Sequence, residues 1–284
     1  MSSPKVWFIT GSSSGFGRNM TEFVLENGDI AVATLRKPEV LTDLAANHPP
    51  DKLLVLKLDV TKQEEINAAF AAAVKRFGRV DVVFNNAGYA VLGEVEATPE
   101  AHVRALFDVN FFGALNVSKE AVRIFRDANK PQGGRLLQMS STYVYHGAPA
   151  MGALSASKGA LNGMSESLAD ELDPDWNIKV TLLEPGVFNT SAIGSVVRVE
   201  PPPAYTKPAL ASMQTRSFFA NNTFPPGVPS TSGAVDAFYK VAALEDPPLH
   251  FSLGTDAIAT AKKHAIDLLA TVEKVSSFSS NLPV

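Results

Sequence analysis

VWFITGSSSGFG, residues 6–17, is the stretch of the chain that decides its fold. Val6 to Thr10 have the length and apolar character of a buried strand, and a turn rich in glycine and serine follows directly. Gly11, Gly15 and Gly17 carry no Cβ, so the backbone can turn tightly and come close to a ligand there. A helix that begins at this turn points its positive end at the same place, which suits a pyrophosphate. The stretch therefore predicts a strand, a turn and a helix around a bound dinucleotide.

Short apolar runs and helical patterns alternate along most of the chain. The runs fit strands buried on both faces of a parallel sheet, and they span residues 6–9, 30–33, 53–56, 80–84, 135–139 and 178–183. Helical patterns lie between them at 16–27, 38–47, 62–77, 99–127 and 152–172. Thr61-Lys62-Gln63-Glu64 is expected to form a capping box at the start of the third helix. This alternation predicts an α/β protein with a doubly wound parallel sheet, a Rossmann fold, and a single domain over residues 1–284.

Composition limits the function only mildly. The chain has 284 residues, 45% hydrophobic and 19% charged, which is ordinary for a globular protein. Its net charge of −4 gives no basis for a nucleic-acid or anionic-membrane partner. The sequence has no cysteine, and its five histidines lack metal-ligand spacing, so no metal is expected. No signal segment or apolar run of about 18 residues occurs, and we expect a cytoplasmic protein.

A proline-rich segment interrupts the alternation after the sixth predicted strand. Seven prolines lie between Asn189 and Ser232, with no clear helix or strand period. A loop of this length in a compact domain commonly forms a lid or a binding loop. Phe218, Phe219 and Phe224 argue against a solvated linker, because exposed phenylalanines there would be unfavourable. We therefore expect residues 190–232 to form a substrate-binding lid that closes over the reaction site.

Further motifs follow the glycine turn in a fixed order. They are Asp59, Asn85-Asn86-Ala87-Gly88, Asn110 within residues 109–113, Ser141, the stretch GALSASKGAL at residues 152–161, and Pro185 to Thr190. With the Gly-x-x-x-Gly-x-Gly turn, this series resembles the short-chain dehydrogenase/reductase family over about residues 5–190. The resemblance implies a nicotinamide coenzyme held by Gly11, Ser13, Ser14, Gly15, Phe16, Gly17, Arg36, Asp59, Asn86, Lys158, Val187 and Thr190. Ser12 is expected to add a further hydroxyl donor in the turn.

The end of the second predicted strand indicates which coenzyme binds. An acidic residue there would bind the ribose 2′-hydroxyl, whereas a basic residue accommodates a 2′-phosphate. This chain has Arg36 and Lys37 at that place, and Asp29 lies too early in the sequence to reach it. The sequence therefore favours NADP(H).

Leu154 occupies the position at which the family has its catalytic tyrosine. The resemblance implies that Ser141 polarises the substrate, that Lys158 supports the tyrosine and binds ribose, and that Asn110 belongs to the proton relay. Leucine can neither give nor take a proton, and a positioned general acid is worth about 10²–10⁴-fold in rate. Ordinary ketone reduction is therefore expected to be severely slowed unless another group acts.

Several interpretations of this departure remain open. Tyr143 is the foremost substitute proton donor, with Tyr145 and His146 in the same loop. Alternatively the substrate is an iminium ion, whose carbon accepts hydride with no proton needed. A cyclase or isomerase without redox chemistry, or a sensor that binds NADP(H), would also tolerate leucine.

We expect an NADP(H)-dependent oxidoreductase that acts on the C=O or C=N bond of a small apolar metabolite. The resemblance also implies a homodimer or homotetramer formed through helices 99–127 and 152–172.

Overall fold

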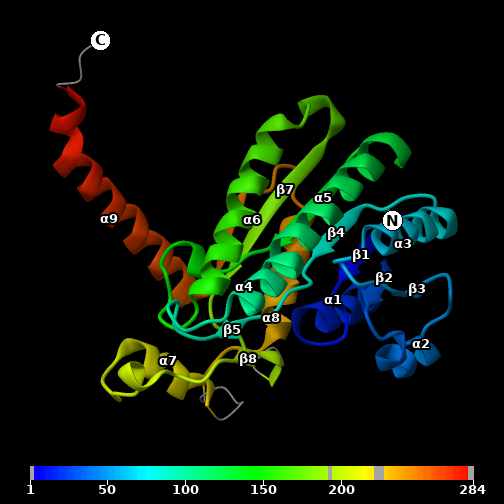
Figure 1. Cartoon of the computed structure of the whole chain (residues 1–284). Coiled ribbons are helices and arrows are strands. Elements are labelled where there is room, and N and C mark those ends of the chain that lie inside the picture. The colour runs from blue at the N-terminus through cyan, green and yellow to red at the C-terminus, as the bar shows by residue number, and fades with distance from the viewer. Residues whose placement is uncertain (1–2, 191–193, 221–226, 281–284) are drawn as a thin grey trace.

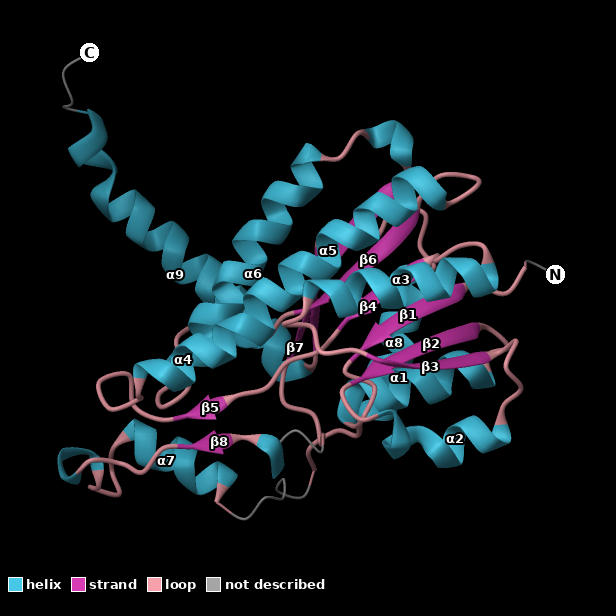
Figure 2. Cartoon of the chain, turned by 45° about the vertical axis from the view of Figure 1, so that its right-hand side comes forward, coloured by secondary structure: helices cyan, strands magenta, loops and turns pink. Residues whose placement is uncertain are grey.

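Seven parallel strands form the centre of the molecule, and helices cover both faces of the sheet (Figures 1 and 2). The computed structural model describes residues 3–190, 194–220 and 227–280. In spatial order the strands are β3 (Leu53–Lys57), β2 (Ile30–Leu35), β1 (Val6–Thr10), β4 (Val82–Asn85), β6 (Gly134–Met139), β7 (Ile178–Pro185) and β9 (His250–Leu253). A separate parallel pair joins β5 (Val91–Leu92) to β8 (Val197–Arg198).

The helices form two layers with the sheet between them. One layer contains α1 (Gly15–Glu26), α2 (Thr42–Asn47) and α8 (Thr231–Ala242), and the other contains α3 (Gln63–Phe77), α5 (Ala114–Arg123) and α6 (Gly152–Glu171). The remaining α-helices of the described part are α4 (Glu100–Phe107), α7 (Ala211–Phe219) and α9 (Thr255–Ser280). Within that part, no helix has both the length and the apolar character needed to cross a membrane.

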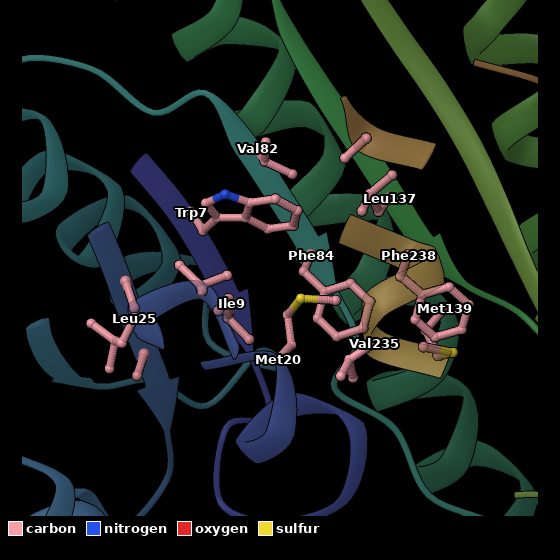
Figure 3. Packing of buried hydrophobic residues seen from close by; sticks show 14 of the residues in the cluster. Trp7, Ile9, Met20, Leu25, Val82, Phe84, Leu137, Met139, Val235 and Phe238 are labelled. Atoms are coloured by element: carbon pink, nitrogen blue, oxygen red, sulfur yellow. The ribbon is translucent and has the colours of Figure 1, made fainter. Parts of the chain in front are cut away.

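Alternate residues of β1 serve opposite layers. Trp7 and Ile9 belong to one buried cluster, whereas Val6 and Phe8 belong to the other. Figure 3 shows the first cluster, in which Phe84 of β4 lies between Trp7 and Ile9 on one side and Phe238 of α8 on the other. Because every residue of β1 is buried, the strand reads as a continuous apolar run rather than an alternating one.

A crevice for a ligand is expected where the strand order reverses, between β1 and β4. Both strands end at the same edge of the sheet, because they are parallel and paired in register from Trp7 with Val82 to Ile9 with Phe84. Thr10 joins the two ends, since its Oγ1 accepts hydrogen bonds from the N–H groups of Asn86 (2.9 Å) and Ala87 (3.0 Å). The glycine turn and the Asn85-to-Gly88 motif are thereby held side by side.

The doubly wound parallel sheet predicted from the sequence is confirmed, including all six predicted strands to within a few residues. The seventh strand, β9, and helices α8 and α9 were not predicted. β9 is a four-residue strand at the edge of the sheet and is partly exposed, so it lacks the apolar run that marks the buried strands. The prediction of no regular structure in residues 190–232 is wrong, because β8 and α7 lie there.

The predicted capping box at Thr61 is also wrong. The helix begins at Gln63 after Lys62, with no side-chain cap. The Thr61 hydroxyl instead donates to Oδ1 of Asp59 at 2.8 Å, and Glu65 rather than Glu64 accepts from the backbone N–H of Asp59. Thr61 thus lies one residue before the cap position, and its side chain contacts Asp59 rather than the first turn of the helix.

The predicted helix 99–127 is continuous in the structure but not regular. Two π-helical segments, η2 (Asp108–Gly113) and η3 (Ile124–Ala128), follow α4 and α5. π-segments of this kind widen a helix locally and are frequent at functional sites. The first of them carries Asn110.

We predict that Phe238→Ala lowers the free energy of unfolding by about 3–5 kcal/mol, because Phe238 is fully buried and the cavity would not be refilled. Chemical denaturation measures this. Lys240→Ala on the same helix is the control, since its ion pair with Asp236 is exposed and its removal should change stability by less than about 0.5 kcal/mol. Equal effects of the two substitutions would mean that α8 does not cover the sheet as described.

Candidate coenzyme and active site

The glycine turn has the geometry that a dinucleotide requires. Gly11 and Gly15 have φ values of +69° and +55°, in the left-handed region that favours glycine. A Cβ on Gly17 would lie 2.2 Å from the carbonyl oxygen of Gly11, so only glycine lets α1 approach the turn this closely. The N-terminal end of α1 has Ser14 as its cap residue, without a side-chain capping bond, and no acidic residue in its first turn. Its positive end is therefore available to a phosphate.

Two residues of the turn have roles that the sequence did not indicate. Ser12 is buried and its hydroxyl donates to the Ile9 carbonyl at 3.1 Å, so it closes the turn and does not face a ligand as expected. Ser13 and Ser14 are exposed, as ligand-binding residues must be before the ligand arrives. Phe16 is partly buried, with its ring edge-on to Phe188 and Phe238, and contributes to packing beneath the turn.

The end of β2 is basic and is not paired with Asp29. Asp29 instead accepts hydrogen bonds from the Lys5 N–H, the Trp7 indole and the Tyr239 hydroxyl, all at the opposite end of the strand. Arg36 is exposed immediately after β2. Burial raises the pKa of Asp59. Hydrogen bonds from Thr61 and the positive charges of Arg36 and Lys62 lower it by a larger amount, so the pKa of Asp59 lies below its ordinary value. Arg36 and Asp59 therefore lie near one another at the sheet edge.

Asn86 supports the glycine turn from the neighbouring strand. Its Nδ2 donates to the Thr10 carbonyl at 2.9 Å and, at 3.5 Å, to the Gly11 carbonyl. Asn85, by contrast, is buried and donates to Ala114 and Gln138. The Asn85 side chain thus stabilises the sheet and its covering helix, and the Asn86 side chain stabilises the glycine turn.

Asn110 is buried in the π-segment η2 and holds the backbone that follows this motif. Its Oδ1 accepts from the Tyr89 N–H at 3.1 Å, and its Nδ2 donates to the Tyr89 carbonyl at 3.0 Å and to Ser157 at 3.2 Å. A Cβ on Gly88 would lie 3.1 Å from Asn110 Oδ1 and 3.6 Å from Lys158 Nζ. Asn110, Gly88 and Lys158 therefore meet at one place.

Lys158 is buried on α6 and its ammonium donates to the Met139 carbonyl at 2.5 Å. Burial lowers the pKa of Lys158 from 10.5 to about 8, because a charged group is disfavoured away from water. A partly deprotonated lysine at the end of β6 can respond to a nearby charge or proton donor at physiological pH.

Position 154 is part of an apolar cluster that joins α6 to the segment of residues 194–220. Leu154 packs in this cluster with Tyr143, Val196 and Phe218, around a centre formed by Leu92, Ala150, Met151 and Phe219. The cluster contains no carboxylic acid, and Tyr143 is its member with a hydroxyl group. Phe224, which the sequence predicts as part of the lid, lies outside the described residues.

Ser141 and Tyr143 form one small turn. Ser141 is the cap residue of the 3₁₀ segment η4 (Thr142–Val144), and its Oγ accepts from the Tyr143 N–H at 3.2 Å. Burial, and the negative charge of Asp256, raise the pKa of the Tyr143 hydroxyl. Tyr143 therefore keeps its proton at neutral pH and lies at the edge of the apolar cluster that contains Leu154.

Tyr145 is occupied elsewhere, which removes it as a substitute donor. Its hydroxyl donates to the fully buried carboxylate of Glu184, which also accepts from Asn162 at 2.9 Å. Burial and this bond raise the pKa of Tyr145 to about 12. His146 is exposed, with its ring 5.9 Å from that of Tyr143.

Asp256 is a residue of this region that the sequence did not single out. Its Oδ2 accepts from the Val187 N–H at 2.8 Å, and a Cβ on Gly186 would lie 2.1 Å from its Oδ1. Val187 and Thr190 stand in the turn after β7, as the sequence places them. The sequence analysis did not single out Asp256, because it did not predict the helix in whose first turn Asp256 lies.

The segment of residues 194–220 is attached to the body by polar contacts as well as by the apolar cluster that contains Leu154. β8 pairs with β5, and Arg216 forms a two-pronged ion pair with Glu94 at 2.6 and 2.9 Å. Both side chains are largely buried, at 12% and 3% exposure. The hydrogen bond from Arg216 lowers the pKa of Glu94 more than burial raises it.

A doubly wound sheet with a glycine turn at its switch point defines a dinucleotide-binding α/β protein. The sequence profile of the short chain dehydrogenase family matches residues 5–200. The chain is 35% identical over 277 residues to an uncharacterized oxidoreductase of Schizosaccharomyces pombe, across 96% of this chain and 90% of that protein. It therefore belongs to the short-chain dehydrogenase family and is an oxidoreductase of that type.

Solved structures agree with this assignment. A short-chain dehydrogenase from Streptomyces avermitilis is 33% identical and superposes with a TM-score of 0.87, covering 100% of both chains. A short-chain dehydrogenase from Burkholderia cenocepacia in complex with NADP is 27% identical, with a TM-score of 0.72 over 96% of this chain and 97% of that one.

We predict that coenzyme affinity falls as the pH rises through about 8. The expected contact of Lys158 with the ribose hydroxyls requires a protonated ammonium, and the lowered pKa means that this form is lost above about 8. Titration of NADPH fluorescence from pH 6 to 10 measures the dissociation constant. Lys158→Met should bind more weakly at pH 6 and show no inflection near 8. An inflection that survives this substitution would assign the effect to another group.

Proposed function

We propose that this chain is an NADP(H)-dependent reductase that acts on the C=O or C=N bond of a small apolar metabolite. The observation that carries the proposal is the combination of a complete coenzyme-binding edge with an apolar wall at position 154. The glycine turn, Asn86, Asn110 and Lys158 fit the coenzyme, while Leu154 lies among aliphatic and aromatic side chains. Bound NADPH would supply the hydride.

The preference for a phosphorylated coenzyme rests on Arg36. It is exposed at the end of β2, next to the Asp59 region where the adenosine half of the coenzyme would lie, and Asp29 is engaged at the other end of the strand. A guanidinium pairs well with a 2′-phosphate through two parallel hydrogen bonds. No acidic side chain of β2 or its immediate continuation, residues 30–37, would repel that phosphate.

For carbonyl substrates we assign the proton-donating role to Tyr143. Its hydroxyl is held protonated by burial and by Asp256, whose carboxylate lies on the turn expected to receive the nicotinamide. Ser141 fixes the turn that carries Tyr143, so loss of either residue would disturb the same geometry. A general acid with a raised pKa transfers its proton more slowly than one whose pKa is close to the working pH. The raised pKa of Tyr143 therefore fits a slow or specialised carbonyl reductase.

Reduction of a C=N bond is the second candidate, and the apolar surroundings of Leu154 favour it. Hydride addition to an iminium carbon gives a neutral amine directly, so no proton donor is required at that position. The apolar side chains around Leu154 would also pack against the alkyl groups of the iminium ion. Retention of Ser141, Asn110 and Lys158 argues against an NADP(H) sensor, which needs only the coenzyme site, whereas a cyclase or isomerase would also use Ser141.

We also propose that residues 190–232 act as the substrate-binding lid. Phe218 and Phe219 already pack in the cluster that contains Leu154, so closure would place aromatic surface against an apolar substrate. The substrate class follows from these walls, which offer little charge to recognise a strongly polar molecule.

We expect NADPH to bind at least about tenfold more tightly than NADH, because one charge-assisted contact is worth about that factor. Isothermal titration calorimetry of both coenzymes measures it. Arg36→Ala should remove the preference by weakening NADPH alone, and its unchanged NADH affinity serves as the internal control for folding. Equal affinities in the wild-type protein would contradict the assignment of Arg36.

We expect Leu154→Tyr to raise the rate of ketone and aldehyde reduction by about 10²-fold or more, since it restores a positioned acid beside Lys158. Single-turnover oxidation of NADPH with simple carbonyl probes measures the rate. Iminium reduction by the same variant should be unchanged or slower, because a phenol adds bulk and polarity to the wall.

Tyr143→Phe separates the two routes. It should abolish wild-type carbonyl reduction and leave iminium reduction within about twofold, since only the first needs a proton. Calorimetric NADPH binding by Tyr143→Phe is the control for an intact site. Carbonyl reduction that persists in Tyr143→Phe at the wild-type rate would exclude Tyr143 as the donor.

A further inference from the structure

Helix α9 extends away from the body of the molecule, as Figures 1 and 2 both show. It spans 26 residues, but its contacts with the body lie near its beginning. Ala257 is fully buried there, and the ring of His264 lies 5.8 Å from that of Tyr145. From Lys262 to Ser279 every residue is exposed. A helix of this length is not stabilised by local propensity alone and ordinarily needs a surface to pack on.

An apolar stripe runs along α9 and is open to solvent. Its members recur every three or four residues, the spacing of one helix face, and they are Ile258, Ala261, Ala265, Leu268, Leu269, Val272 and Val275. The five large side chains among them are between 44% and 60% exposed. Charged residues occupy the other side of the helix, including the exposed ion pair of Lys263 with Asp267. A contiguous patch on the order of a few hundred Å² marks an interaction surface on a soluble protein.

We propose that this stripe is a dimerisation surface and that its occupant is α9 of a second copy of this chain, packed antiparallel. The residues of the stripe satisfy a heptad repeat, in which Ile258, Ala265 and Val272 alternate with Ala261, Leu268 and Val275. Such a repeat is the pattern that one helix offers to another helix, not to a flat surface. The proposal is independent of the coenzyme and of the reaction.

The antiparallel direction follows from size and charge. In that direction Ala261 faces Val272 of the other copy and Ala265 faces its Leu268, so a small residue meets a large one in these central layers and the helices approach closely. Lys262 and Glu273 border the same edge of the stripe, and antiparallel pairing brings Lys262 of each copy near Glu273 of the other. Parallel pairing would instead place the edge that carries Lys262 and Glu273 against the opposite edge of the partner helix, so these two charges would not meet.

The charge pattern disfavours a lipid surface as the occupant. Helices that lie on membranes carry an excess of lysine and arginine on the polar face. From Lys262 to Ser280, α9 has three lysines opposed by Asp267 and Glu273, which leaves little excess positive charge. A mixed polar face suits a helix whose outer side stays in water.

The first turn of α9 contacts the candidate active site. Asp256, in its first turn, accepts from the Val187 N–H in the turn after β7. Pairing of two α9 helices would therefore fix the direction of a helix whose first turn contacts the turn expected to receive the nicotinamide.

The test compares particle mass in solution by size-exclusion chromatography with light scattering, using the full chain. Leu268→Glu combined with Val272→Glu should raise the dissociation constant of self-association at least about 100-fold and halve the mass at micromolar concentration, whether the wild type is a dimer or a tetramer. Ala270→Glu is the matched control, because it adds a carboxylate on the polar side of the same helix and should leave the mass unchanged. Far-ultraviolet circular dichroism and NADPH binding confirm that each variant is folded.

A charge exchange tests the direction of pairing. Lys262→Glu alone should weaken association about tenfold, and so should Glu273→Lys alone, whereas the double exchange should restore it. Equal masses for wild type and the stripe variant would overturn the proposal, as would failure of the double exchange to restore association. Sedimentation of wild type, but not the stripe variant, with vesicles of phosphatidylcholine and phosphatidylserine would assign the stripe to a membrane and overturn it as well.

Discussion

The hydroxyl of Thr10 and the missing side chain of Gly17 together determine where everything else in the site can lie. Thr10 hydrogen-bonds the end of β1 to the backbone that follows β4. Gly17 lets α1 come within contact distance of the glycine turn that connects β1 to α1. A methyl group at Gly17 would push the helix off the Gly11 carbonyl, and its positive end would no longer point at the crevice. Asn86 repeats the same restraint from the other strand. The coenzyme-binding edge is therefore a property of two adjoining strand ends, not of the turn alone.

The chemistry at position 154 is set by the surroundings as much as by the leucine. In the apolar cluster a side chain with a charge or an unpaired hydroxyl would be costly, and Leu154 instead adds packing to Tyr143 and Phe218. Lys158, one helical turn away, is left with a backbone carbonyl as its hydrogen-bond partner and a lowered pKa. The region thus combines an apolar cluster at position 154 with polar side chains at Asn110 and Lys158, and the proposed hydride acceptor with little polar surface would fit it.

Residues whose role is fixed by backbone geometry were the ones that the sequence identified. The glycine turn, the buried strands and the Asn85-to-Gly88 motif follow from short-range patterns, and the structure places them together. Residues whose role depends on tertiary contact were missed. Asp256 reaches Val187 across 69 residues, and Ser12 is buried although the next two residues, Ser13 and Ser14, are exposed. The capping box expected at Thr61 is absent because the helix begins one residue later, with Lys62 as its cap residue, and local spacing does not reveal such a shift. The edge strand β9 lacked a pattern because half-exposed short strands have none.

The ion pair between Arg216 and Glu94 gives the segment of residues 194–220 a dependence on temperature and salt that apolar contacts lack. Separating that segment from the body would hydrate two charges that are now largely buried. Dissolved ions screen the separated charges and so favour the detached form. Heating acts in the opposite sense, because the cost of keeping ions out of water falls as temperature rises while the gain from apolar burial levels off. The two attachments of this segment, ionic and apolar, therefore fail under different conditions, and the ionic one is the last to be weakened by heat and the first to be weakened by salt.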